Sequence, residues 1–255
     1  PDWLSFFMFT YFTDRDGKMQ LESLAQSGFD PLSRTCRFML TEEAHHMFVG
    51  ETGVGRTIQA TAEAMNKAGI TDPYDINAVR DLGVIDLPTI QKKLNLHYSL
   101  SLDLFGQEVS TNAANAFNAG IKGRYMEHRL EDDHKLSNDT YNVKMIRDNH
   151  IITEQIPALN AINMRLRDDY VNDASGGLSR WNRTLKRANI EFAFTLPHEG
   201  FNRSIGVFSS VSINPQGNII SVDEWASQSS NWLPTKSDGA FIQSLMKPCF
   251  EAGEY

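Results

Sequence analysis

The sequence contains little cysteine, no run of basic residues and no long apolar segment. Its two cysteines, Cys36 and Cys249, lie far apart and give no disulfide framework, which suits a reducing compartment. The net charge is −8, from 24 basic and 32 acidic residues, so nucleic acid and anionic membranes are poor candidate partners. The longest strongly apolar run, residues 3–12, is too short to cross a bilayer and lacks the basic start of a signal peptide. We therefore expect a cytoplasmic protein that binds neither nucleic acid nor membrane.

The composition is that of an ordinary soluble globular protein, with 41% hydrophobic and 22% charged residues. A length of 255 residues is enough to bury a large core, in one large domain or in a domain with an extension. The sequence begins at Pro1 instead of Met, and we expect it to be a fragment of a longer protein.

Helical patterns dominate the first half of the chain. Asp30 as N-cap and Pro31 in the first turn begin the second helix, and Gly69 closes the third. The glycines at 53 and 55 predict a break between those two helices. The connector at 71–82, with a short helix, predicts a crossover between bundle halves. The expected long helices cover residues 3–26, 32–50, 54–67, 86–119 and 124–136.

The pattern changes after residue 138. We expect a helix over 143–168 interrupted by Pro157, a loop at 172–177 and a short basic helix at 179–187. Beyond these, extended segments are expected at 190–196, 205–213 and 218–222, with a turn at 214–217. The sequence thus predicts a helical bundle in residues 1–138 and a helical and β or irregular extension in 139–255 that caps it.

The hexapeptide Thr-Glu-Glu-Ala-His-His at 41–46 lies within a predicted helix and holds two overlapping Glu-x-x-His pairs. Glu42 and His45 share one helix face, and Glu43 and His46 share the next. A Glu-x-x-His pair supplies a carboxylate and an imidazole, which is half of a carboxylate-bridged two-metal centre in a four-helix bundle.

A second copy of the pattern follows at a shift of 89 residues. The shift relates Glu42 to Glu131, the His at 45 to His134, and Asp14 to Asp103. Four helices that supply two single acids and two Glu-x-x-His pairs are what a ferritin-like di-iron bundle needs. Solvated helix faces also carry Glu and His, but the matched spacing favours the metal site. The expected ligands are Asp14, Glu42, His45, Asp103, Glu131 and His134.

Several positions stay open. Glu43 and His46 fit the Asp/Glu-Glu-x-x-His pattern of di-iron helices and compete with the preferred pair. Asp16 competes with Asp14, and Glu108 competes with Asp103. Glu127 shares a stripe with the second Glu-x-x-His pair and is either an extra ligand or a solvated acid. The neighbouring acids Asp132 and Asp133 are candidates to orient His134, although solvated acids are the favoured reading for both.

Four carboxylates and two imidazoles suit two iron or manganese ions. The high carboxylate count and the absence of cysteine ligands favour iron over zinc. We therefore expect a mainly α, ferritin-like four-helix bundle with a di-iron core and a C-terminal irregular or β extension.

The chain resembles the oxygenase component of benzoyl-CoA 2,3-epoxidases, a ferritin-like di-iron family. The resemblance runs over nearly the whole chain. The segments that carry it are DRDGK at 14–18, FDPLSRTC at 29–36, EEAHHMFVG at 42–50, SLDLFG at 101–106, STNAANAF at 110–117 and TLPHEGFNR at 195–203. One departure is that di-iron relatives more often have Glu on the first helix, where this chain offers Asp14.

The resemblance implies a bacterial enzyme of aerobic benzoate degradation that epoxidises the ring of benzoyl-CoA with O₂. It also implies electrons from NADPH, delivered by a separate reductase with FAD and iron–sulfur clusters. The alternatives are a di-iron oxygenase or N-oxygenase on another carrier-bound aromatic, and a non-catalytic metal-binding bundle. Candidate contacts for CoA phosphates are Arg180, Arg183, Lys186, Arg187 and Arg203, and candidate pocket aromatics are Trp3, Phe6, Phe7, Phe117 and Trp181.

Overall fold

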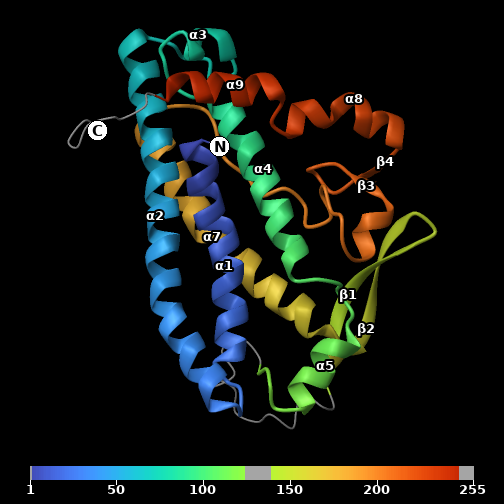
Figure 1. Cartoon of the computed structure of the whole chain (residues 1–255). Coiled ribbons are helices and arrows are strands. Elements are labelled where there is room, and N and C mark those ends of the chain that lie inside the picture. The colour runs from blue at the N-terminus through green and yellow to red at the C-terminus, as the bar shows by residue number, and fades with distance from the viewer. Residues whose placement is uncertain (1, 124–138, 247–255) are drawn as a thin grey trace.

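The computed structural model describes residues 2–123 and 139–246. Four long helices pack into a bundle: α1 (Trp3–Leu24), α2 (Asp30–Ala68), α4 (Leu87–Leu104) and α7 (Ile162–Arg187). In Figure 1, α2 and α4 lie on either side of α1, and α7 lies behind. The predicted mainly α bundle with a short β extension is confirmed.

One hydrophobic core joins the four helices. Its fully buried side chains include Phe12 from α1, Ile58 from α2, Leu94 from α4 and Leu185 from α7. Within the described part of the chain, no helix is both long enough and apolar enough to cross a membrane.

The break predicted between residues 50 and 54 is wrong, because α2 runs through it as one helix to Ala68. Gly50 and Gly53 instead lie where α2 meets α1. A Cβ on Gly53 would overlap the Phe7 ring, and one on Gly50 would lie 2.5 Å from the backbone nitrogen of Tyr11. These glycines therefore let two helices approach closely, and tertiary packing outweighs their low helix propensity.

The predicted helix over 86–119 is two helices. Its first part begins near the expected residue, where Asp86 caps α4 by accepting a hydrogen bond from the Thr89 backbone N–H at 2.8 Å. The helix ends before Gly106, whose φ of +79° is left-handed, and α5 (Thr111–Asn118) begins after it. The short helix expected in the connector is confirmed as α3 (Ile76–Arg80), whereas the helix expected at 124–136 lies outside the described residues.

The helix predicted over 143–168 is wrong before the interruption at Pro157, whereas its last residues, 162–168, are helical and belong to α7. The earlier residues form a β hairpin of β1 (Thr140–Arg147) and β2 (His150–Pro157). Asp148 and Asn149 join the strands, with φ values of +49° and +59° that a two-residue hairpin turn requires. The 3₁₀ helix η2 (Ala158–Ala161) then leads into α7.

The expected loop at 172–177 and short helix at 179–187 are instead continuous parts of α7. Gly177 of that helix packs against Tyr11, where a Cβ would overlap the phenol. The segment 190–196 has no regular secondary structure and pairs with no strand among the described residues.

The last described segment closes one end of the bundle. The expected turn at 214–217 joins β3 (Ser212–Ile213) to β4 (Ile219–Ile220), preceded by the 3₁₀ helix η3 (Val207–Ser210). Two further helices, α8 (Val222–Trp232) and α9 (Lys236–Leu245), lie across the end of α4, with α9 beside α3 (Figure 1). The division at residue 138 stays a prediction, although the common core includes α7 from the second segment.

Candidate metal site

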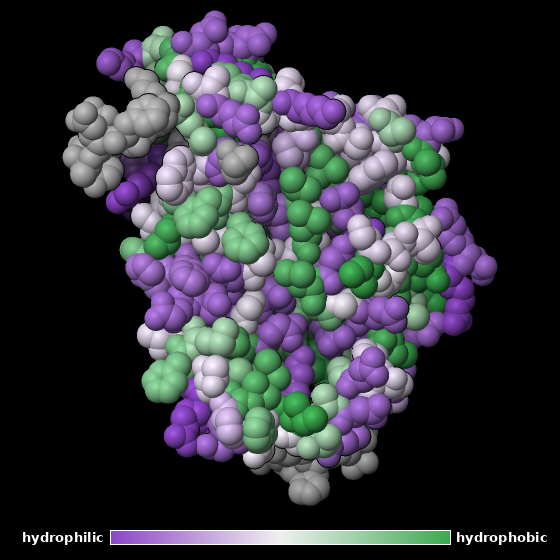
Figure 2. Space-filling view, viewed as in Figure 1, coloured by the Kyte–Doolittle hydropathy of each residue, from purple (hydrophilic) through white to green (hydrophobic). Residues whose placement is uncertain are grey.

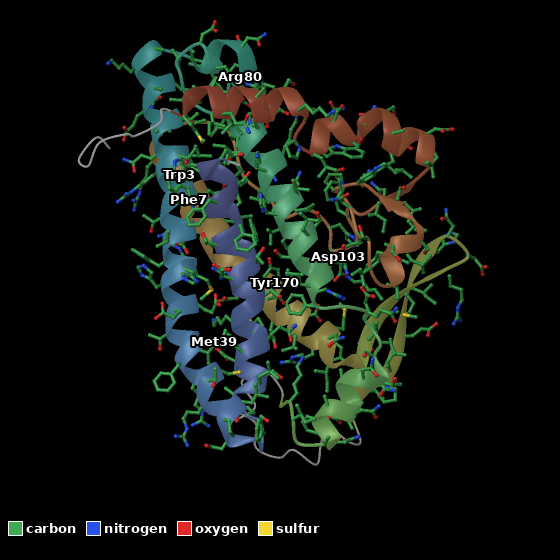
Figure 3. All side chains as sticks on the ribbon, viewed as in Figure 1. Trp3, Phe7, Met39, Arg80, Asp103 and Tyr170 are labelled. Carbon is green, nitrogen blue, oxygen red and sulfur yellow. The ribbon has the colours of Figure 1, made fainter. Side chains whose placement is uncertain are left out.

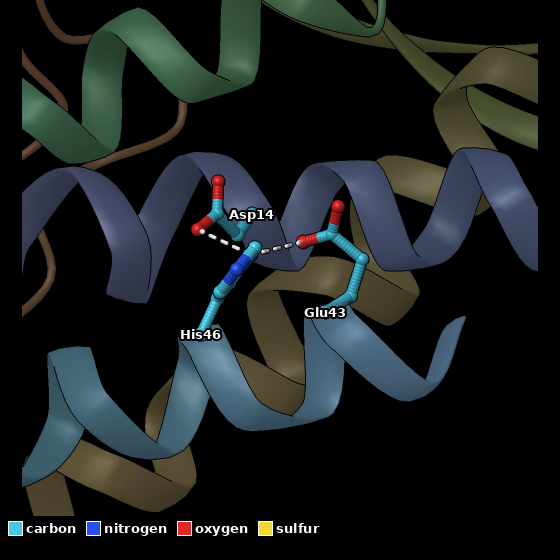
Figure 4. A group of neighbouring side chains, drawn as sticks. All are labelled: Asp14, Glu43 and His46. Atoms are coloured by element: carbon cyan, nitrogen blue, oxygen red, sulfur yellow. Dashed lines mark ion pairs between the residues drawn. The ribbon is translucent and has the colours of Figure 1, made fainter. Parts of the chain in front are cut away.

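The structure brings Asp14, Glu43 and His46 together between α1 and α2 (Figure 4). The His46 Nδ1 lies 3.5 Å from Asp14 Oδ2 and 3.7 Å from Glu43 Oε2. One potential ligand atom of each residue lies within 4.8 Å of the others. The Glu-x-x-His spacing puts both α2 side chains one turn apart on the face toward α1.

Small residues leave room for this cluster. Gly50 and Gly53 continue the stripe of α2 that carries Glu43 and His46, and they hold α2 close to α1. On α1, Gly17 follows Asp14 by one turn, and a Cβ there would lie 3.6 Å from Glu43 Oε1. A larger side chain at position 17 would therefore compete with the Glu43 carboxylate for space.

The electrostatics of the cluster suit a bound cation. Burial, together with the negative charge of Glu43, raises the pKa of Asp14 to about 6, and His46 opposes that rise. The buried Oε2 of Glu43 has no hydrogen-bond partner among the described residues. Two carboxylates and an imidazole are ligands that iron, manganese and zinc accept, so the donor set fits a transition metal. The His46 side chain is 46% exposed, which leaves the cluster open on one side.

The preferred pair from the sequence, Glu42 and His45, is exposed and belongs to no group of three or more potential ligands in the described ranges. The alternative pair, Glu43 and His46, faces α1. Glu43, His46, Gly50 and Gly53 form one helical stripe in the sequence, but only the contact with α1 shows that this stripe faces inward. The 89-residue repeat carries no information about which of the two pairs faces α1.

Asp103 and its alternative Glu108 serve a different purpose. Asp103 forms an ion pair with Arg203, and its Oδ2 accepts from the Ser204 backbone N–H at 2.9 Å. Glu108, fully buried, accepts from Arg167 Nη1 at 2.9 Å and from the backbone N–H of Val207 at 2.8 Å. Both acids therefore hold the 203–207 segment against the bundle, and neither joins the Asp14 cluster.

Arg203 is only 7% exposed, so the structure does not leave it free for a CoA phosphate. Of the other cationic candidates, Arg180 forms an ion pair with Glu51. Arg183, Lys186 and Arg187 are exposed on α7 and form no ion pair with any described residue.

Asp16 points into the bundle core instead of toward α2. It is 6% exposed, its Oδ1 has no hydrogen-bond partner among the described residues, and burial raises its pKa to about 6. The expected ligands Glu131 and His134, the possible ligand Glu127, and the neighbouring Asp132 and Asp133 all lie outside the described residues.

The candidate aromatics divide between surface and core. Trp3 and Phe6 are exposed on α1, and Phe7 packs at Gly53 (Figure 3). Trp181 is buried with its ring centroid 4.8 Å from that of Tyr11, and Phe117 packs partly buried against the core. Figure 2 shows hydrophobic side chains over α1, α2 and α4 on the face seen in Figure 1. The exposed ones on these helices include Trp3, Phe6, Phe9, Phe38, Phe48, Leu100 and Leu104.

No protein-family profile matches the sequence. The chain is 54% identical, over all 255 residues, to the benzoyl-CoA oxygenase component B of Aromatoleum evansii. It spans 53% of the length of that protein. The resemblance that the sequence motifs indicated is confirmed by this similarity.

Proposed function

We propose that the chain is part of the di-iron oxygenase component of a benzoyl-CoA 2,3-epoxidase. The cluster of Asp14, Glu43 and His46 carries the proposal, together with the 54% identity to a benzoyl-CoA oxygenase component B. The reaction would add one oxygen atom of O₂ to the aromatic ring of benzoyl-CoA, in the cytoplasm of a bacterium that degrades benzoate.

The three residues form half of a ferritin-like metal centre. Asp14 supplies the single acid of one helix, and Glu43 with His46 supplies the carboxylate and imidazole of the next. The cluster is open on the His46 side, and the Oε2 of Glu43 has no hydrogen-bond partner among the described residues, which leaves room for further ligands. We propose that those ligands lie outside the described residues, either at Glu131 and His134 or in the part of a longer protein that this chain does not span.

A bound pair of iron ions would supply the activation of O₂. The protein contributes a partly buried, carboxylate-rich site, and a bound cation would favour the charged form of Asp14, whose pKa burial raises to about 6. Because one oxygen atom enters the ring and the other becomes water, the reaction needs two electrons from outside. The component name of the relative implies a partner component. We propose that this partner is an NADPH-dependent reductase with FAD and iron–sulfur clusters.

The test is metal content and Mössbauer spectroscopy of iron-reconstituted protein, for this chain and for the longer protein. Glu43→Gln removes a ligand, whereas Glu42→Gln alters the exposed neighbouring residue and is the matched control. We expect antiferromagnetically coupled iron in the parent and in the Glu42 variant, and its loss in the Glu43 variant. Retention in both, or equal loss in both, would refute the assignment. Oxygenation of benzoyl-CoA with O₂ and the reductase then tests the reaction itself.

A further inference from the structure

A cavity of about 570 Å³ lies beside the bundle, between α4, α7, the first hairpin and the loop at 196–199. Its size is within the range of small-molecule sites. It is separate from the Asp14 cluster, since none of the three cluster residues lines it.

The inner wall of the cavity carries an unused hydroxyl. Tyr98 of α4 is 1% exposed and lines the cavity, yet its phenol forms no hydrogen bond with any described residue. Burial raises the pKa of Tyr98, with Glu199 adding to the rise, so the hydroxyl stays protonated and able to donate. A phenol that lines a cavity and has no protein partner there is available to donate a hydrogen bond to a ligand.

A second donor comes from His198. Its Nδ1 accepts the backbone N–H of Gly200 at 3.0 Å, which places the proton of the neutral ring on Nε2. Burial lowers the pKa of His198 and keeps the ring neutral. The side-chain amide of Asn172, also in the lining, has no hydrogen-bond partner in the described part of the chain and offers both a donor and an acceptor.

The charges in the cavity are already paired and sum to a negative value. Lys144 pairs with Glu199, and Arg165 pairs with Asp169 at 3.2 Å. A third acid, Asp168, accepts a hydrogen bond from the Tyr141 phenol. Three acids against two cations oppose an anionic ligand, whereas the free oxygens of these acids can accept hydrogen bonds from amide and hydroxyl groups.

We propose that this cavity binds the uncharged arm of an acyl-CoA thioester, the pantetheine portion with its amide and hydroxyl groups, and not the CoA phosphates. That the ligand is a CoA thioester rests on the proposed function. The apolar stem of the arm would lie along Val171, Leu196 and Pro197, which share the lining. The cavity is also close to the ligand-bearing helix, because the Tyr98 ring packs edge-on against Phe12, two residues before Asp14.

The test is calorimetric titration of the 255-residue chain with pantetheine and, separately, with adenosine 3′,5′-bisphosphate. Pantetheine should bind the parent, and Tyr98→Phe, which removes only the hydroxyl, should weaken it about fivefold, the effect of one hydrogen bond. Asn172→Trp, at an exposed helix position in the lining, should block it at least tenfold without disturbing the core. Tyr11→Phe is the control, because it loses a buried hydrogen bond to the Ala174 carbonyl but does not line the cavity.

Pantetheine affinity that is unchanged in both cavity variants would overturn the inference, as would binding of the bisphosphate that those variants abolish. The titration needs neither metal nor O₂, so the two proposals fail separately. Iron-loaded protein that oxygenates benzoyl-CoA but binds pantetheine elsewhere refutes the cavity alone. Pantetheine binding in the cavity, together with a longer protein whose Asp14 cluster holds no iron, supports the inference and refutes the oxygenase assignment.

Discussion

Gly50 is the residue at which the packing of α1 and α2 is least tolerant of change. A Cβ at this position would lie 2.5 Å from the backbone nitrogen of Tyr11 and 2.7 Å from the carbonyl oxygen of Phe7. The first distance is about 0.9 Å inside the 3.4 Å at which ordinary contact begins. Backbone atoms in a buried helix cannot rotate away, so Gly50→Ala must move the two helices apart.

The magnitude follows from two opposing effects. Overpacking of this kind costs about 1–3 kcal/mol, and a clash with backbone belongs at the upper end. Replacing glycine by alanine within a helix stabilises the helix by about 1 kcal/mol, because alanine has the higher helix propensity. We therefore expect Gly50→Ala to destabilise the protein by about 2 kcal/mol. Because His46 lies one turn before Gly50 on the same stripe, the variant should also weaken metal binding at the cluster.

Gly55→Ala is the matched control. It lies on the same helix, and its Cβ would meet only the Trp181 ring at 3.6 Å, an ordinary contact. This variant should keep metal binding and gain up to about 1 kcal/mol in stability. Urea unfolding measures both stabilities, and titration with Fe²⁺ measures the metal affinity. Equal stability of the two alanine variants would refute the reasoning, because it would show that α1 and α2 do not need their close approach.

Three further predictions concern buried charges. Arg80→Met should lower the free energy of unfolding by about 3 kcal/mol, measured in urea, because Arg80 binds the buried Asp86 at 2.7 Å and Asp238 of α9 at 2.6 Å. Arg34→Met is the control and should change stability little, because Arg34 forms an exposed ion pair. Burial alone would raise the pKa of Asp238, but the Thr235 backbone N–H and Arg80 outweigh it and lower that pKa to about 2. Stability that is present above pH 4 should therefore fall as the pH drops toward 2, and less steeply in the Arg80 variant. Asp14→Asn should stabilise the metal-free chain by about 1–2 kcal/mol at pH 7 but not at pH 4, because a raised carboxyl pKa removes stability as the pH rises through 6. If the unfolding midpoints of Asp14→Asn and the parent differed by the same amount at pH 7 and at pH 4, the prediction for Asp14 would be contradicted.

The sequence predicted well those features that depend on neighbouring residues. Gly69 closes α2 in the left-handed conformation, and a helix begins at Leu87 beside the expected start at residue 86, because such signals act within one turn of backbone. The expected N-cap Asp30 is wrong, since Phe29 holds that position without a side-chain hydrogen bond and Asp30 is the first residue of α2. The hairpin at 140–157 was missed, since its strands carry no regular alternation of buried and exposed side chains along their whole length. The glycines of α2 and α7 were misread because a glycine that ends a helix and one that admits a neighbouring helix look alike in sequence.

The candidate site divides in the same way. The sequence alone determined that the segment at 41–46 is a helix with two Glu-x-x-His pairs and that Asp14 lies on the preceding helix. Only the tertiary structure decided that Glu43 and His46 meet Asp14, while Asp103 meets Arg203. The physical reason is that one residue along a helix turns a side chain by about 100°. Which of two adjacent pairs faces inward is therefore set by the neighbouring helix and by the glycines that bring it close.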